Sequence, residues 1–116
     1  LESKQTLLNA LAILIPVAWR LLALRTLGRS HPQSAALIVL SQLQIEVLQA
    51  VYETKYKKRL SKNMTVEDAM KAVAALGGHI KNNGLPGWQV LGRGFQDLLI
   101  YEQGWSAAMN QKRCDQ

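Results

Sequence analysis

The chain has 116 residues, 48% of them hydrophobic, which is enough for one domain with a core of its own. Its 14 basic and 8 acidic residues give a net charge of +6, which permits contact with phosphate without requiring it. The single cysteine, Cys114, excludes a disulfide framework and fits a reducing, cytoplasmic compartment. Because the chain begins with Leu1 rather than methionine, we expect it to be a piece of a longer protein.

A first helix is predicted over residues 3–27, with Gly28 as its end. Apolar residues lie on nearly every face of this helix, which is typical of a helix buried in the centre of a domain. Pro16 is expected to kink it. Its strictly apolar run, residues 10–19, is shorter than the about 20 residues that a membrane-spanning helix needs. No signal-peptide pattern is present either, so we expect a buried core helix and no membrane partner.

The middle of the chain predicts one ambiguous segment and then a second helix. Residues 34–40 fit either a short strand or a helical turn. Ser41, followed three residues later by Gln44, is a capping-box pattern, in which each side chain bonds the backbone N–H of the other residue. Apolar residues then recur at helical spacing. We therefore expect a second helix over residues 42–56.

A third helix is predicted over residues 66–76, because Thr65 is a good N-cap and two acidic residues occupy the first turn, where the helix dipole favours them. Gly77 and Gly78 end this helix. A basic stretch precedes it, and its cations are Lys55, Lys57, Lys58, Arg59 and Lys62. A solvated loop is the usual state of such a run, and contact with DNA phosphate is the functional hypothesis for it.

A fourth helix is predicted over residues 87–111, after a loop at residues 79–87. Spacings of three and four alternate along it, as in a coiled coil, in the series Trp88, Leu91, Phe95, Leu98, Glu102, Trp105 and Met109. Glycines cost about 1 kcal/mol each against alanine inside a helix, so Gly92, Gly94 and Gly104 suggest a closely packed neighbour. The chain therefore predicts an all-α fold of about four helices, a small irregular bundle with a long C-terminal helix.

The residues that could carry catalysis do not form any known catalytic pattern. His31 and His79 have no partner at metal-ligand spacing, and we expect them to be capping or surface residues. The acids are scattered, whereas two-metal phosphoryl transfer needs converging carboxylates. Helix capping explains the one adjacent pair, Glu67 and Asp68. We expect no enzymatic activity and no metal or cofactor in this chain alone.

Several blocks of the sequence resemble one known family. Residues 76–79, 84–95 and 104–108 read LGGH, GLPGWQVLGRGF and GWSAA, and residues 17–25 and 39–41 read VAWRLLALR and VLS. In this order and spacing they resemble the end of the transposases of the insertion-sequence-four family, to which the transposon-five transposase belongs. The chain departs from that pattern at Pro16, at Arg93 and at Phe95, where the family has an uninterrupted helix, an acidic residue and a tryptophan.

The resemblance implies a bacterial cut-and-paste DNA transposase of the DDE class. Its parent would have an RNase H-like catalytic core that uses two divalent ions, magnesium or manganese. The last catalytic glutamate of the family lies in a Tyr-Arg-Glu-Lys signature, which is not found in this sequence, so no catalytic residue is carried over. The implied role of this chain is that of the C-terminal domain. Its helices would hold two subunits together as a homodimer, and the parent protein would bind the transposon-end DNA.

The predicted dimer interface lies on the fourth helix. It comprises Trp88, Leu91, Gly94, Phe95, Leu98, Tyr101, Gly104, Trp105 and Ala108. These aromatic and aliphatic residues are too apolar for a lone surface helix, and the small ones permit close approach of a second helix. For Trp88 and Leu91, packing inside the domain against the first helix is equally open. The C-terminal half, residues 98–109, is the stronger candidate for contact with a partner.

Two other hypotheses remain open at this stage. One is a DNA-binding module, because the basic loop joins two helices as in a helix-turn-helix. Against it, the connection over residues 56–65 exceeds the usual turn of about three or four residues, and the third helix carries one basic residue, Lys71. The other is a structural helical bundle unrelated to transposition. Residues upstream of Leu1 that contained the Tyr-Arg-Glu-Lys signature would favour the transposase.

Overall fold

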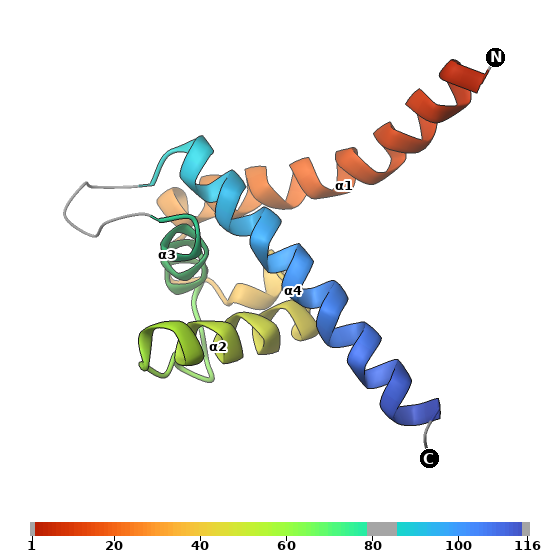
Figure 1. Cartoon of the computed structure of the whole chain (residues 1–116). Helices are drawn as coiled ribbons and strands as arrows, with labels where there is room; N and C mark the ends of the chain where they lie inside the picture. Colours follow the sequence, from red (N-terminus) through yellow and green to blue (C-terminus); the bar gives the residue numbers. More distant parts are fainter. Residues whose placement is uncertain (1, 79–85, 115–116) are drawn as a thin grey trace.

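The computed structural model describes residues 2–78 and 86–114 (Figure 1). In chain order its helices are α1 (Glu2–Ser30), the short 3-10 helix η1 (Ala36–Ile38), α2 (Gln42–Tyr56), α3 (Val66–Leu76) and α4 (Trp88–Cys114). The described residues form no strand, only one isolated bridge between Ala35 and Thr65. The predicted all-α fold with a long C-terminal helix is confirmed. The predictions for His79 and for most of the loop before α4 lie outside the described residues.

Helices α2 and α3 begin and end where the sequence predicts. The Ser41 hydroxyl accepts a hydrogen bond from the Gln44 backbone N–H at 3.1 Å, and Gln44 Oε1 accepts one from the Ser41 N–H at 3.0 Å. Thr65 and Asp68 form the same reciprocal box at the start of α3. Capping signals of this kind are local in sequence, so they locate helix ends without knowledge of the tertiary fold.

Helix α3 lies at the centre of the fold. It packs against α4, α1, α2 and η1, and Figure 1 shows it nearly end-on, between the end of α1 and α2 and beside α4. Most of its side chains are buried: Val66, Ala69, Met70, Ala72, Val73, Ala74 and Leu76. Because α3 is buried on several sides, it organises the core around which α1, α2 and α4 are arranged.

The tightest contact in the core is the crossing of α3 and α4 at two glycines. A Cβ atom on Gly94 would lie 2.7 Å from the carbonyl carbon of Val73, and one on Gly77 would lie 2.9 Å from the backbone nitrogen of Gly94. Real Cβ atoms do not approach backbone so closely, so the two helices meet backbone to backbone. The close neighbour expected for the α4 glycines is therefore α3 at Gly94. Gly104 meets nothing within 4 Å, and Gly92 meets only a Leu21 methyl group at 4.0 Å.

Helix α1 differs from its prediction in two respects. It continues past Gly28 to Ser30, and Gly28 packs against α3, where an added Cβ would lie 2.6 Å from the sulfur of Met70. The expected burial of the whole helix is also wrong. Only the C-terminal half packs, with Leu24 in the core, whereas the described side chains of residues 3–16 are exposed. Figure 1 shows this N-terminal half projecting away from the other helices.

The exposed half of α1 leaves a large apolar surface in contact with solvent. The exposed large side chains along it are Leu7, Leu8, Leu11, Leu14, Ile15 and Trp19. Residues Ser3–Ser30 are long and apolar enough to cross a membrane by length and composition, and 6% of the apolar window is buried in the chain. Core helices of soluble proteins and signal sequences have the same length and composition. The apolar residues on every face of α1 predicted that other elements would bury it, but the other helices of the chain bury only its C-terminal half.

The glycine crossing generates a prediction about stability. Gly94→Ala should lower the free energy of unfolding by roughly 2–4 kcal/mol, because the new methyl group would force α3 and α4 apart. Gly104→Ala is the matched control on the same helix. It should be neutral or stabilising by up to about 1 kcal/mol, because the position is open and alanine favours helix. Urea unfolding followed by circular dichroism measures both, and equal stability of the two variants would contradict the close crossing.

Candidate pairing surface

Helix α4 divides into a core half and an exposed half. Leu91, Phe95 and Leu98 are completely or almost completely buried within the chain, and Gly94 is buried against α3. Gly94, Phe95 and Leu98, which were predicted to face a partner subunit, therefore pack inside the chain, and for Leu91 the structure shows the packing inside the domain that the sequence left open. The apolar stripe continues along the same side of the helix, but its N-terminal part is already covered by α1, α2 and α3.

Trp88, at the first turn of α4, contacts α1 rather than standing alone. The Arg25 guanidinium lies over its ring, 4.3 Å from the ring centre, which is the geometry of a cation–π contact. Trp88 remains 44% exposed, so its other side is accessible. Of the two placements left open for this residue, the structure shows the contact with the first helix.

The C-terminal half of α4 extends beyond the other helices, as Figure 1 shows. Tyr101, Trp105, Ala108 and Met109 are exposed on it, and Gly104 has open space around it. Three large apolar side chains in three turns form an exposed patch on a helix whose earlier turns bury one side in the core. We call residues 101–112 the α4 overhang. It retains the part of the predicted interface that is accessible to a partner.

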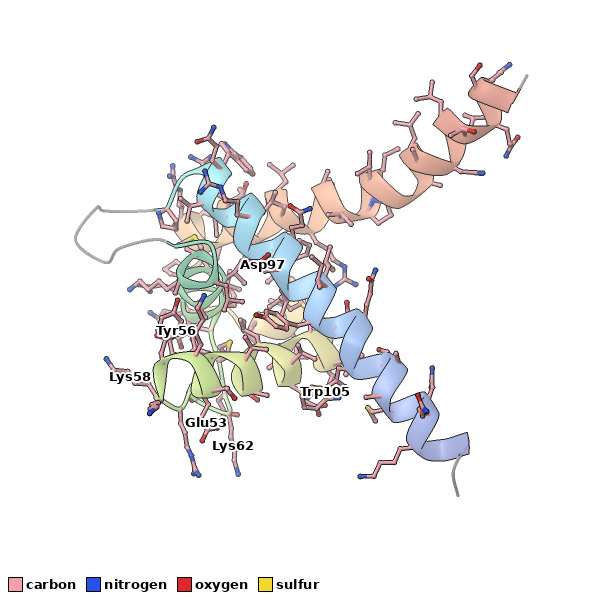
Figure 2. The ribbon with its side chains drawn as sticks, in the orientation of Figure 1. Glu53, Tyr56, Lys58, Lys62, Asp97 and Trp105 are labelled. Atoms are coloured by element: carbon pink, nitrogen blue, oxygen red, sulfur yellow. The ribbon has the colours of Figure 1, made fainter. Side chains whose placement is uncertain are left out.

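An open groove lies where the overhang passes α2. Its lining residues are Ala50, Val51, Thr54, Lys55, Tyr101 and Trp105, and its volume is about 500 Å³. Figure 2 shows Trp105 projecting from α4 on the side where α2 lies. The α2 wall of this groove was missed in the sequence, because the apolar stripe of α2 predicts core packing. Val51 is in fact only partly buried, so its spacing was correct but its surroundings were not predictable.

A buried amide fixes the overhang to the rest of the fold. Gln44, 5% exposed, accepts a hydrogen bond from Arg20 Nη1 of α1 at 3.0 Å. Its Nε2 donates to the carboxylate of Glu102 at 3.4 Å. Arg20 also donates to the Val39 carbonyl at 3.5 Å. One side chain thus caps α2 and joins α1 to α4. The charged interruption of the α4 stripe is therefore held at the point where the helix leaves the core.

The basic loop is fully accessible. Lys55, Lys57, Lys58, Arg59 and Lys62 are exposed, and Figure 2 shows Lys58 and Lys62 pointing outward. Arg59 pairs with Glu53 at 3.2 Å, an exposed pair of little energetic weight. Lys57 adopts a left-handed conformation with φ 58° and ends α2. The loop is anchored by the Tyr56 hydroxyl, which donates to the Ala75 carbonyl at 2.7 Å.

Helix α3 offers little to DNA as a recognition helix. It is largely buried, and its one basic residue, Lys71, donates to the Glu67 carboxylate at 2.8 Å. That hydrogen bond and the opposite charge of Glu67 raise the pKa of Lys71. The helix-turn-helix hypothesis therefore loses the helix that would enter the groove, and the basic loop is left as the surface that could meet phosphate.

Among the described residues, no three histidines, cysteines, aspartates or glutamates lie close enough together to hold a metal ion. Asp97, exposed and labelled in Figure 2, stands apart on α4. His31 is exposed, with its Nδ1 3.0 Å from the Ser30 hydroxyl at the end of α1.

Comparison of the chain with family models, curated proteins and solved structures finds no significant match. The resemblance to transposases therefore depends on the sequence blocks alone.

The division of α4 predicts opposite responses to substitution in its two halves. Leu98→Ala should cost about 2–5 kcal/mol of unfolding free energy, because it leaves a cavity in the core. Ala108→Glu should change the stability of the monomer by less than about 0.5 kcal/mol, because the residue is exposed on the overhang. Chemical denaturation at low protein concentration measures both. Unfolding of the chain by Ala108→Glu would mean that the overhang belongs to the core.

Proposed function

We propose that this chain is a non-catalytic helical domain that pairs two subunits of a cut-and-paste DNA transposase. The transposase assignment is supported by the ordered sequence blocks. The pairing role is supported by one observation, the continuation of the buried face of α4 into Trp105 and Met109, which are exposed. The apolar face of such a helix continues beyond the part that is buried in the domain, and a second helix could pack on the exposed part.

The physical case for pairing depends on the composition of the overhang. Tyr101, Trp105 and Met109 supply aromatic and thioether side chains, which are enriched at protein interfaces. Aromatic anchors dominate binding energy once they are desolvated at the centre of an interface. Gly104 and Ala108 have little side chain, so a second backbone can approach the helix between the anchors. In a two-fold dimer each of these contacts occurs twice.

The proposal assigns the chemistry of transposition to other parts of the parent protein. A catalytic core with magnesium or manganese would cut and join the transposon ends, and this domain would hold two such cores together on paired ends. The exposed apolar half of α1 is compatible with the same assignment, because an exposed apolar surface marks contact with another protein or with a membrane. Within this proposal the parent acts in the bacterial cytoplasm.

Pairing is tested with Ala108→Glu. A carboxylate at this position would be buried against the partner helix at two places in the dimer, so the dimer should weaken by at least about tenfold in Kd. Asn110→Glu is the matched control, because Asn110 is exposed on the opposite side of the same turns. Sedimentation equilibrium of the wild type and both variants measures the dissociation constants.

The expected order is equal association of the wild type and Asn110→Glu and weaker association of Ala108→Glu. A wild-type chain that remains monomeric at millimolar concentration would contradict the pairing function. Equal association of all three proteins would show that copies meet elsewhere, with the exposed half of α1 as the first alternative surface.

A second candidate function, DNA contact through the basic loop, is favoured by the exposure of its five cations. Changing Lys57, Lys58 and Lys62 together to glutamine should then lower the salt dependence of DNA binding, because fewer counterions are released. Binding would be weak and independent of sequence. Fluorescence anisotropy with a labelled duplex at several salt concentrations gives the slope. A slope unchanged by the triple substitution would mean that the loop is only solvated.

A further inference from the structure

We propose that the α4 overhangs of two copies pair antiparallel, in the register that places Glu102 of one copy beside Lys112 of the other. The inference depends on the proposed pairing function and adds to it the orientation, the register and the residues that decide them. It arises from the charges on the overhang, whereas the pairing proposal arises from its apolar surface.

The four residues that define the register lie on one side of α4. Glu102, Trp105, Met109 and Lys112 follow spacings of three, four and three, the repeat that keeps side chains on one face of a helix. Leu91, Phe95 and Leu98 continue the same repeat toward the N-terminus and are buried. The packing of these core residues therefore fixes the direction in which this face of α4 points, and the same face continues beyond the core. Glu102 is half-buried, and Lys112 is exposed.

An antiparallel two-fold pair brings together residues that are equidistant from its centre. With the centre at the level of residue 107, Glu102 and Lys112 are each five residues away, and Trp105 and Met109 are each two residues away. One register thus places both acid–base contacts and both aromatic–thioether contacts opposite each other. The coincidence is specific to this register, because a shift of one turn opposes neither set.

The charges select this orientation over a parallel one. Among the described residues, neither Glu102 nor Lys112 is in a salt bridge within the chain. A parallel pair would place Glu102 against Glu102 and Lys112 against Lys112 at the ends of the contact, and like charges at facing positions are unfavourable. The antiparallel pair opposes unlike charges at both ends. It also opposes the two helix dipoles.

The groove between α2 and α4 gives the partner helix a place to lie. A partner that runs antiparallel across Trp105 places its own Met109 over the groove formed with Ala50 and Val51. A thioether against an aromatic ring is a favourable contact, and the flexible methionine side chain suits an open apolar groove. The two-fold axis repeats the arrangement at the other copy, so both grooves are filled. The occupant of the groove is therefore a second copy of this chain.

A charge-swap experiment on the full chain tests the register. Glu102→Lys opposes lysine to lysine in the homodimer, and Lys112→Glu opposes glutamate to glutamate. Each single variant should dimerise at least about tenfold more weakly than the wild type, because both contacts become repulsive. The double variant should recover the wild-type dissociation constant. A mixture of the two single variants should form a heterodimer, because every contact in it is again between opposite charges.

Gln103→Lys is the control, since it also introduces a lysine, one residue from Glu102 and turned about 100° away from it, at a position where Gln103 is exposed. Circular dichroism checks that each variant is folded. Lys112→Glu provides the test if loss of the Gln44 contact destabilises Glu102→Lys. The comparison of the homodimers decides the orientation, because a parallel pair would face like charges in the wild type, in each single variant and in the double variant, and all four would associate equally.

The outcomes separate the register from the pairing function. Weak single variants, a restored double variant and a heterodimer support the antiparallel register. A dimer that Ala108→Glu weakens but that both single charge variants leave unchanged would overturn the register and retain the pairing function. Weak single variants with no recovery in the double variant would overturn the antiparallel orientation. A wild-type chain that remains monomeric would overturn both proposals.

Discussion

The backbone contact between α3 and α4 is the constraint on which the rest of the structure depends. Gly77 and Gly94 have no side chains, so the two helices cross with their backbones in contact. That contact fixes the rotation of α4 about its own axis, which turns Leu91, Phe95 and Leu98 into the core. Because a helix repeats its faces along its length, the same rotation decides where every later side chain of the stripe points. The surface offered by the overhang is thus set by packing about three turns upstream.

A second, polar constraint holds α4 where it leaves the core. Gln44 serves the α2 capping box and also bonds Arg20 and Glu102, so three helices meet at one amide. A buried polar group of this kind specifies position more than it adds stability, because its partners must lie in one arrangement for every hydrogen bond to form. Just beyond this point Trp105 lines the open groove with α2. The molecule therefore combines a rigid core with two projecting helices, the N-terminal half of α1 and the α4 overhang (Figure 1).

The features that the sequence predicted correctly are those with local causes. The ends of α2 and α3 followed from capping boxes, which act within one turn. The α4 stripe was predicted from its spacing, but only the tertiary fold decides which part of a stripe is covered, so Phe95 and Leu98, predicted at an interface, lie in the core. Glycine is typical of helix ends, but Gly28 lies inside α1, where its lack of a side chain permits close packing against Met70. The apolar residues of α1 indicated that the helix is buried, but they did not indicate against what. Within this chain the other helices bury only its C-terminal half.

Hydrogen exchange at low and high protein concentration tests the central claim, that the α4 overhang pairs two copies. The end of a long, uncovered helix frays and exchanges quickly, whereas a helix docked against a partner is protected. The amides of residues 101–112 should become more protected as the concentration rises, and those of residues 88–98 should not change, because the core already protects them. The contrary result is a rise in protection confined to the N-terminal half of α1, with the overhang exchanging equally fast at both concentrations.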